Sequence, residues 1–180
     1  MPMLTKDRTV VDDRWVMLPE TAAIADVPVS TPAIVPLALW SAQHDVLAAR
    51  DDIGVWLKPA DDPEALAGDV AKLPLIAVDF PKFADGRGYS TARLLREKYR
   101  YGGELRAIGD ILRDQLYYLR QCGFDTFALR PGRNVVGALA ALGDFSDNYQ
   151  ATVAQPVPLF RRRLQTAAAE SPASSESSRR

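Results

Sequence analysis

Short apolar segments alternate with amphipathic segments over residues 53–142, and this alternation limits the possible folds more than any other feature. The expected strands are Ile53–Leu57, Leu75–Phe80, Glu104–Ile108 and Thr126–Leu129. Strands that alternate with helices of about ten residues are typical of right-handed β-α crossovers and a mainly parallel sheet. The sequence therefore predicts an α/β fold of successive β-α units, either a half (β/α)-barrel or an open three-layer sheet.

Capping residues predict where the helices between these strands begin and end. Polar residues that can accept a hydrogen bond from the first turn stand before each amphipathic segment. The expected N-caps are Asp62, Ser90 or Thr91, Asp110 and Asn134. Gly123 is expected to end the third of these helices in a left-handed conformation, directly after Cys122. The last helix is expected over Val135–Leu142.

The chain divides into three segments: a flexible N-terminus (1–10), a single α/β domain (11–150), and an extended, low-complexity C-terminal tail (151–180). The tail ends in Ala167–Arg180, whose Ser, Ala and Glu residues cannot bury enough apolar area to order a chain. A strand over Arg14–Leu18 and a helix over Leu37–Arg50 precede the repeats. The connector between them is dense in proline, which favours coil or an edge strand.

Charged residues and glycines gather where two of the expected strands end. In β-α folds these strand ends lie on the side of the sheet that binds ligands. The candidate binding residues are Asp79, Lys82, Asp85, Gly86, Arg87, Gly88, Asp110, Arg113 and Asp114.

The turn Asp85–Ser90 has the composition of an oxyanion site. Gly86 and Gly88 allow positive φ and a close approach of backbone amides, and Arg87 and Lys82 add positive charge. The alternative is a turn that needs two glycines only to reverse the chain.

The second group of charged residues also has two interpretations. Asp110, Arg113 and Asp114 could form an Asp–Arg network that pins neighbouring loops, or could include a catalytic carboxylate.

The composition argues against several function classes. One cysteine in 180 residues excludes an internal disulfide, fits a reducing cytoplasm and cannot supply the four thiolates of an iron–sulfur cluster. No metal site is predicted. A formal net charge of −1 argues against a nucleic-acid partner. No segment approaches the ~18 apolar residues of a membrane span, and the first residues lack the apolar core of a signal peptide.

The stretch VDFPKFADGRGYSTARLLREKYRYGGELRAIGDILRDQLYYLRQCGFDTFAL closely resembles a bacterial family of uncharacterised proteins, domain of unknown function 934. The resemblance includes PLALW, GVWLKPADDPEAL and ALAALGDFSDNYQ, and so spans Pro36 to Gln150. Members of this family often carry a label that describes them as oxidoreductases of sulfite reduction. Their genes commonly sit beside those of assimilatory sulfite reductase. The resemblance implies a role in reducing sulfite to sulfide for cysteine synthesis.

Two function classes fit these observations. The first is an accessory protein of sulfur assimilation that acts with sulfite reductase and binds an oxyanion without running a redox cycle alone. The second is an oxidoreductase that holds a diffusible nicotinamide or flavin cofactor at the strand ends. Thr91 stands where a dinucleotide fingerprint has its third Gly, which favours the first class. A half-barrel also leaves strand edges that a partner or a second copy of the chain would cover.

Overall fold

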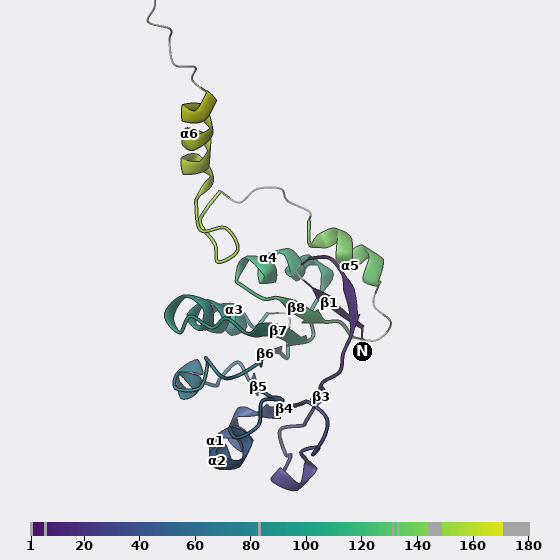
Figure 1. Cartoon of the computed structure of the whole chain (residues 1–180). Coiled ribbons are helices and arrows are strands. Elements are labelled where there is room, and N and C mark those ends of the chain that lie inside the picture. The colour runs from purple at the N-terminus through teal and green to yellow at the C-terminus, as the bar shows by residue number, and fades with distance from the viewer. Residues whose placement is uncertain are drawn as a thin grey trace, which may run out of the picture.

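A single curled sheet organises the chain. The structure is a computed structural model that describes residues 2–5, 7–82, 84–130, 132, 134–143 and 149–170. Eight strands lie in the order β2-β1-β8-β7-β6-β5-β4-β3 (Figure 1). The strands are β1 (Pro2–Thr5), β2 (Val10–Asp12), β3 (Val16–Met17), β4 (Ala33–Pro36), β5 (Ile53–Leu57), β6 (Leu75–Phe80), β7 (Glu104–Gly109) and β8 (Thr126–Ala128).

The six strands from β8 to β3 run parallel, whereas β1 pairs antiparallel with both β8 and β2. The parallel part curls into a half-barrel with helices between its strands, which confirms the predicted fold class and selects the half-barrel.

The connection between the two edge strands requires this curl. β2 and β3 lie at opposite edges of the sheet, yet only residues 13–15 separate them in the chain. Four residue steps span at most about 14 Å, whereas a flat sheet of eight strands is about 34 Å wide. The extended segment Val10–Met17 therefore crosses the open side of the half-barrel (Figure 1).

Helical segments follow most of the parallel strands. They are η1 (Ile24–Asp26), α1 (Leu37–Ala42), α2 (His44–Leu47), η2 (Pro63–Leu66), α3 (Arg87–Arg93), the π-helix η3 (Leu94–Lys98), η4 (Arg113–Gln115), α4 (Leu116–Gln121), α5 (Val135–Ala141) and α6 (Leu159–Glu170).

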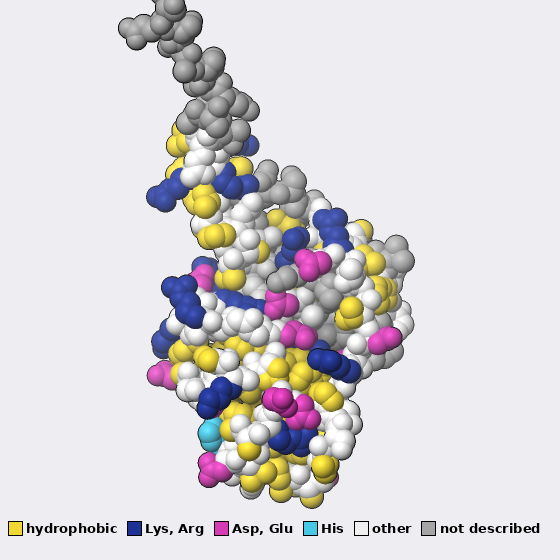
Figure 2. Space-filling model, viewed as in Figure 1, with side chains coloured by type: hydrophobic (Ala, Val, Ile, Leu, Met, Phe, Trp, Pro, Cys, Tyr) yellow, Lys and Arg dark blue, Asp and Glu magenta, His cyan; other side chains and the backbone are white. Residues whose placement is uncertain are grey.

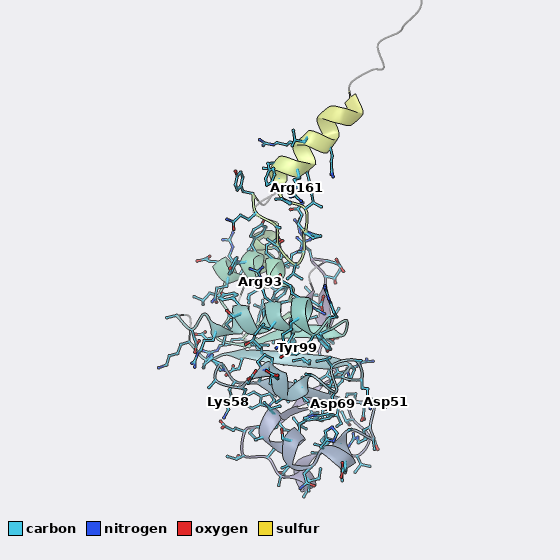
Figure 3. The ribbon with its side chains drawn as sticks, turned by 90° about the vertical axis from the view of Figure 1, so that its left-hand side faces the viewer. Asp51, Lys58, Asp69, Arg93, Tyr99 and Arg161 are labelled. Atoms are coloured by element: carbon cyan, nitrogen blue, oxygen red, sulfur yellow. The ribbon has the colours of Figure 1, made fainter. Side chains whose placement is uncertain are left out.

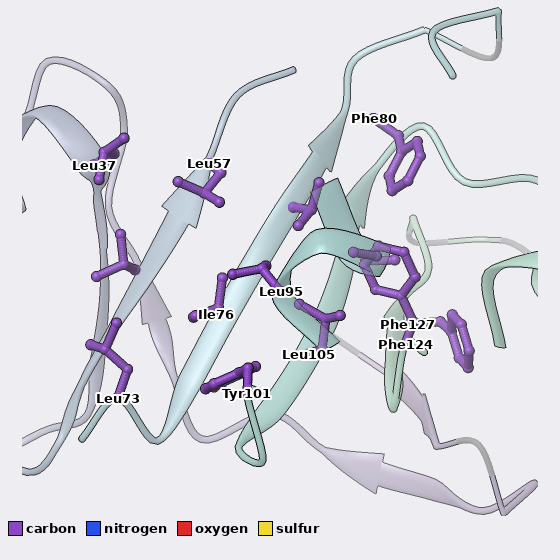
Figure 4. Packing of buried hydrophobic residues seen from close by; sticks show 14 of the residues in the cluster. Leu37, Leu57, Leu73, Ile76, Phe80, Leu95, Tyr101, Leu105, Phe124 and Phe127 are labelled. Atoms are coloured by element: carbon purple, nitrogen blue, oxygen red, sulfur yellow. The ribbon is translucent and has the colours of Figure 1, made fainter. Parts of the chain in front are cut away.

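The larger of two hydrophobic clusters lies between the strands and these helices. Ile76, Leu105 and Phe127 point from successive strands into this cluster, where Leu95 and Phe124 meet them (Figure 4). All five side chains are at most 1% exposed. This face accounts for most of the core, because alternate residues of each strand share it.

The other face of the sheet, inside the half-barrel, holds a smaller cluster. Its members are Ile34, Trp56, Leu75, Ala77, Ile108 and Ala128, with Trp15 packed against them from the crossing segment. Gly54 lies on this face, where a Cβ would come within 3.0 Å of the Leu75 carbonyl oxygen. Glycine at this position therefore lets β5 and β6 approach closely.

A buried arginine ties the crossing segment to this inner face. The Arg106 side chain is 5% exposed, and its Nη1 donates a hydrogen bond to Asp13 Oδ1 at 3.0 Å. Its Nε and Nη2 donate to Glu104 Oε1 at 3.0 and 2.8 Å. Thr126 Oγ1 donates to the same oxygen at 2.6 Å, so residues of β7, β8 and the crossing segment share one network.

Several helices, strands and caps agree with their predicted residues, and others differ from the prediction. Strands β5 and β6 have the predicted bounds, and Asp62, Asn134 and Gly123 take their predicted capping and left-handed roles. The helix predicted over Leu37–Arg50 breaks at Gln43. β1 and β2 begin within the N-terminal segment that was expected to be flexible, and α6 lies where an extended tail was expected.

Two predicted N-caps are wrong. Gly86 rather than Ser90 or Thr91 precedes α3, and no side chain caps that helix. Asp110 does not cap a helix, because the chain turns at Gly109 (φ +96°) and helical structure resumes only at Arg113.

We expect Asp13→Ala to lower the free energy of unfolding by about 2–4 kcal/mol, because a buried guanidinium loses one of its two carboxylates. Urea denaturation measures the change. The matched control is Asp12→Ala, an exposed neighbour in the same segment. This control should stay within about 0.5 kcal/mol of the wild type. An equal loss of unfolding free energy in both variants would contradict the conclusion that the Asp13–Arg106 pair holds the crossing segment against the inner face.

Candidate functional site

Three consecutive parallel strands end in charged side chains at the same edge of the sheet. Asp79 is the second-last residue of β6, Asp110 directly follows β7, and Arg130 follows β8 by two positions. The pairing of Phe80 with Gly109, and a hydrogen bond of 2.7 Å from the Asp110 amide to the Phe80 carbonyl oxygen, bring the first two ends together. We call Asp79, Asp110 and Arg130 the carboxyl-end cluster.

Asp79 is the partly buried member of this cluster. Its side chain alternates with the apolar core residues Val78 and Phe80, so it belongs to the inner face of the half-barrel. A Cβ on Gly109 would lie 2.5 Å from Asp79 Oδ1, so this carboxylate packs directly against the β7 end. Burial raises the pKa of Asp79, and the negative charge of Asp85 adds to the effect. A hydrogen bond to the Phe80 backbone and the charge of Arg130 partly oppose this rise in pKa.

A carboxyl group with a raised pKa is suited to exchange a proton with a ligand or to donate a hydrogen bond to an anion. Asp79 therefore has the physical properties of an acid–base group, although it carries no neighbouring His or Lys among the residues that perturb its pKa.

Asp110 and Arg130 form an ion pair across the ends of β7 and β8. Arg130 Nη1 lies 3.4 Å from Asp110 Oδ1, and their side chains are 55% and 29% exposed. Asp110 thus orients Arg130 while leaving part of the guanidinium open to solvent. Arg130 is not among the residues predicted from the sequence, although it closely follows β8 just as Asp110 follows β7.

A small cavity is lined by chain neighbours of this ion pair. Ile111 directly follows Asp110, Leu129 directly precedes Arg130, and Arg113 begins η4. The other lining residues lie in α5 and its N-cap; they are Asn134, Gly137 and Ala138. The cavity volume is about 210 Å³, below the roughly 300–1,000 Å³ of pockets that enclose drug-sized ligands and cofactors. This size suits a small ligand rather than a whole nucleotide.

The predicted turn Asp85–Ser90 has its own internal ion pair. Arg87 Nε and Nη2 donate to Asp85 Oδ1 and Oδ2 at 3.0 and 2.7 Å, and the Arg87 amide also reaches Asp85 Oδ1 at 3.2 Å. This pairing holds the pKa of Asp85 below its usual range. Much of the positive charge expected for an oxyanion is therefore matched within the turn. Lys82 is exposed nearby in the chain.

Neither Gly86 nor Gly88 uses the positive φ that glycine allows. Gly86 has φ −82°, and Gly88 is a helical residue of α3 outside the left-handed region. The physical requirement at Gly88 is space, because a Cβ there would lie 2.6 Å from the Phe80 ring. Gly88 is thus a packing residue that lets α3 approach the end of β6.

The two predicted groups are linked through the loops that carry them. Gln115 Nε2 donates to the Tyr89 hydroxyl at 3.0 Å, and Gln115 Oε1 accepts from the Leu112 amide at 2.9 Å. This link joins α3 to η4. Arg113 lines the cavity, whereas Asp114 is exposed on η4. The structure therefore places Asp79 and Asp110 at the carboxyl ends of neighbouring strands, with Asp85 close enough to affect the pKa of Asp79. Arg113 lies three residues beyond Asp110, at the start of η4.

A larger hollow of about 360 Å³ lies at the opposite end of the strands, and Arg96 and Asp125 in its lining serve the fold. Arg96 donates to the carbonyl oxygens of Gly123, Tyr101 and Gly103 at 3.0, 2.5 and 3.0 Å, and pairs with Asp125. With its guanidinium committed in this way, Arg96 fastens η3 to the loops that precede β7 and β8.

Within the described residues, no three His, Cys, Asp or Glu side chains gather in a way that could hold a metal ion. None of the helices in the described part of the chain is long and apolar enough to cross a membrane.

We expect Gly88→Ala to cost about 1–3 kcal/mol of unfolding free energy, because the new methyl group overlaps the buried Phe80 ring. Gly86→Ala is the matched control, since its Cβ would meet nothing closer than 4.0 Å. With its ordinary φ, this control should leave stability unchanged or raise it by up to about 1 kcal/mol. Urea denaturation of both variants separates packing from turn geometry. A destabilised Gly86→Ala with an unaffected Gly88→Ala would refute this assignment.

Asp79 generates a pH-dependence prediction of unusual sign. Because burial raises its pKa, the folded protein holds this proton up to a higher pH than the unfolded chain does. Stability conferred by Asp79 is thus full below its unfolded pKa of about 4 and falls as pH rises through the folded value. Asp79→Asn should therefore be more stable than the wild type at about pH 7, and this advantage should vanish at about pH 3.

Asp85→Asn is the control of opposite sign. Arg87 lowers the pKa of Asp85, so its contribution is present at neutral pH and is lost as pH falls. This variant should be less stable than the wild type at about pH 7, and the gap should close on acidification. Urea denaturation across this pH range measures both. An Asp79→Asn protein that is less stable at neutral pH would contradict the burial of that carboxylate.

A family comparison matches the part of the chain that carries this site. The model of a family described as "Bacterial protein of unknown function (DUF934)" matches residues 54–160, which is more than half of the chain. No curated protein matches the chain. The matched range includes Asp79, Asp110 and Arg130. The chain therefore belongs to the DUF934 family of bacterial proteins of unknown function.

Proposed function

We propose that the protein is an accessory protein of assimilatory sulfite reduction that binds sulfite at the carboxyl-end cluster and works with sulfite reductase in the cytoplasm. The observation that supports a ligand site is the convergence of Asp79, Asp110 and Arg130 at the carboxyl ends of three neighbouring strands. The pathway rests on the sequence resemblance, whose family genes commonly neighbour those of sulfite reductase.

The chemistry of the cluster suits a small oxyanion. Arginine donates charge-assisted hydrogen bonds of about 2.7–2.9 Å to anionic oxygens, and the partly exposed Arg130 can present such donors. Arg113 lines the adjoining cavity and adds a second guanidinium. A protonated Asp79 can donate a hydrogen bond to the anion, which a fully ionised carboxylate would repel.

The turn Asp85–Ser90 is the competing place for an oxyanion. An anion there would have to compete with Asp85, which already accepts two hydrogen bonds from the Arg87 side chain. Arg130 is also paired, but Asp110 holds it through a longer contact of 3.4 Å to one nitrogen, so an anion displaces less there. We therefore place the ligand between Arg130 and Arg113.

An oxidoreductase with a diffusible nicotinamide or flavin cofactor is the second candidate. The charged strand ends could hold phosphates, but the adjoining cavity of about 210 Å³ is small for such a cofactor. A thermal shift of the purified protein with NADPH, FMN or FAD that exceeds the shift with sulfite would favour this candidate.

Gene deletion with complementation tests the proposed function. A deletion strain should fail to grow on sulfate or sulfite and should recover on sulfide or cysteine. Wild type and Arg87→Ala should restore growth, whereas Arg130→Gln should not, because the oxyanion loses its main charge. Restoration by Arg130→Gln but not by Arg87→Ala would move the site to the turn Asp85–Ser90. Normal growth of the deletion strain on sulfite would reject the proposed pathway.

Calorimetric titration of the purified protein with sulfite measures binding directly. Loss of a charge-assisted hydrogen bond costs about 1.5–3 kcal/mol, so Arg130→Gln should weaken binding at least about tenfold. Arg87→Ala, the exposed arginine of the neighbouring turn, should bind like the wild type. Sulfate serves as the comparison anion, and equal binding of sulfite by all three proteins would exclude Arg130 from the site.

A further inference from the structure

Helix α6 carries large apolar side chains that the rest of the described chain leaves uncovered. Phe160 is 52% exposed and Leu164 is 68% exposed. The helix stands clear of the body in Figure 1 and again in the perpendicular view of Figure 3, where Arg161 marks its base. A helix of 12 residues is marginal in water by itself, so contacts with another surface would stabilise it.

The start of α6 is nevertheless held against the body. The Val153 amide donates to the Gln121 carbonyl oxygen at 3.1 Å, and Thr152 Oγ1 donates to Gln121 Oε1 at 2.8 Å. The Leu159 amide in turn donates to the Tyr149 carbonyl oxygen at 3.1 Å. These bonds tie the segment before α6 to the end of α4. The helix is thus presented from a fixed base.

The sequence of α6 places arginines on both sides of a narrow apolar stripe. At 3.6 residues per turn, Phe160 and Leu164 lie about 40° apart around the helix. Arg163 lies about 60° beyond Phe160, and Arg161 about 60° beyond Leu164 on the other side. The Arg161 guanidinium sits 5.8 Å from the centre of the Phe160 ring. Figure 2 shows hydrophobic and basic side chains side by side on this projection.

We propose that α6 is a docking helix whose Phe160–Leu164 stripe enters an apolar groove of a partner protein with acidic residues along both rims. Charge complementarity supports this occupant, because an arginine flanks the stripe on each side. An amphipathic helix in a groove is an established mode of recognition, read through anchors at i and i+4. The choice of sulfite reductase as the partner to test rests on the proposed function.

Two other occupants fit the pattern less well. A membrane surface favours a broad apolar face, whereas the described side chains of α6 include only two large apolar groups that are exposed. A second copy of the chain would need an apolar groove with acidic rims. The described cavity with the most apolar lining instead has Arg113 beside Ile111 and Leu129 and no acidic residue in that lining.

Binding of the full-length protein to purified sulfite reductase tests the proposal. Calorimetry should show that Phe160→Ala/Leu164→Ala weakens binding at least tenfold while circular dichroism stays unchanged. Arg161→Glu/Arg163→Glu should also weaken binding and should reverse its salt dependence, because salt then screens repulsion and not attraction. Gln165→Ala, an exposed residue about 100° from Leu164 and outside the stripe, is the matched control and should bind like the wild type.

The remaining outcomes each overturn the proposal. These are no binding to sulfite reductase, or equal binding by the wild type and the Phe160→Ala/Leu164→Ala variant. If sedimentation shows that the wild type self-associates and this variant does not, the stripe binds a second copy of the chain. Binding to phosphatidylglycerol vesicles lost in the same variant would assign it to a membrane. Sulfite titration of the variant keeps the two proposals apart, because the carboxyl-end cluster should bind sulfite whether or not α6 docks.

Discussion

The structure depends on the passage of the chain from one edge of the sheet to the other within three residues. Asp13–Trp15 joins β2 to β3, and the Asp13–Arg106 pair holds that passage against the inner face. A buried guanidinium with two carboxylates around it is stable only while all three groups stay together. The curl that results turns the inner side chains of neighbouring strands toward one another. Asp79 is one of them, so the closure of the half-barrel also shapes the candidate site.

Local sequence patterns predicted those elements whose stability is local. β5 and β6 matched to the residue because turn-forming residues flank each strand, and all their residues except Asp79 are buried. β4 was missed because its surroundings are rich in proline, and Pro36 itself ends the strand. That strand exists because β3 and β5 pair with it on both sides. Pairing between distant segments outweighed local propensity there, as it did for β1.

The sequence predicted where the candidate site lies but not which of its charged side chains form ion pairs. Asp79 lies near the end of one expected strand and Asp110 just beyond another, and parallel strands place their carboxyl ends on the same side of the sheet. Which charges neutralise one another depends on side-chain geometry, and Arg87 turned out to bind Asp85 within its own turn. Arg130 escaped because it is an isolated arginine in the loop after a short strand. Only the folded sheet brings Arg130 to Asp110.

The two proposed surfaces lie at opposite ends of the half-barrel, and this separation has a functional consequence. The segment that carries α6 is tied to the end of α4, which leads back to the amino end of β8. The carboxyl-end cluster lies at the other end of strands such as β6, whose six residues span about 20 Å. A partner held by α6 therefore leaves that edge of the sheet open. Under the proposed function, this arrangement lets a small anion enter or leave while the complex stays intact.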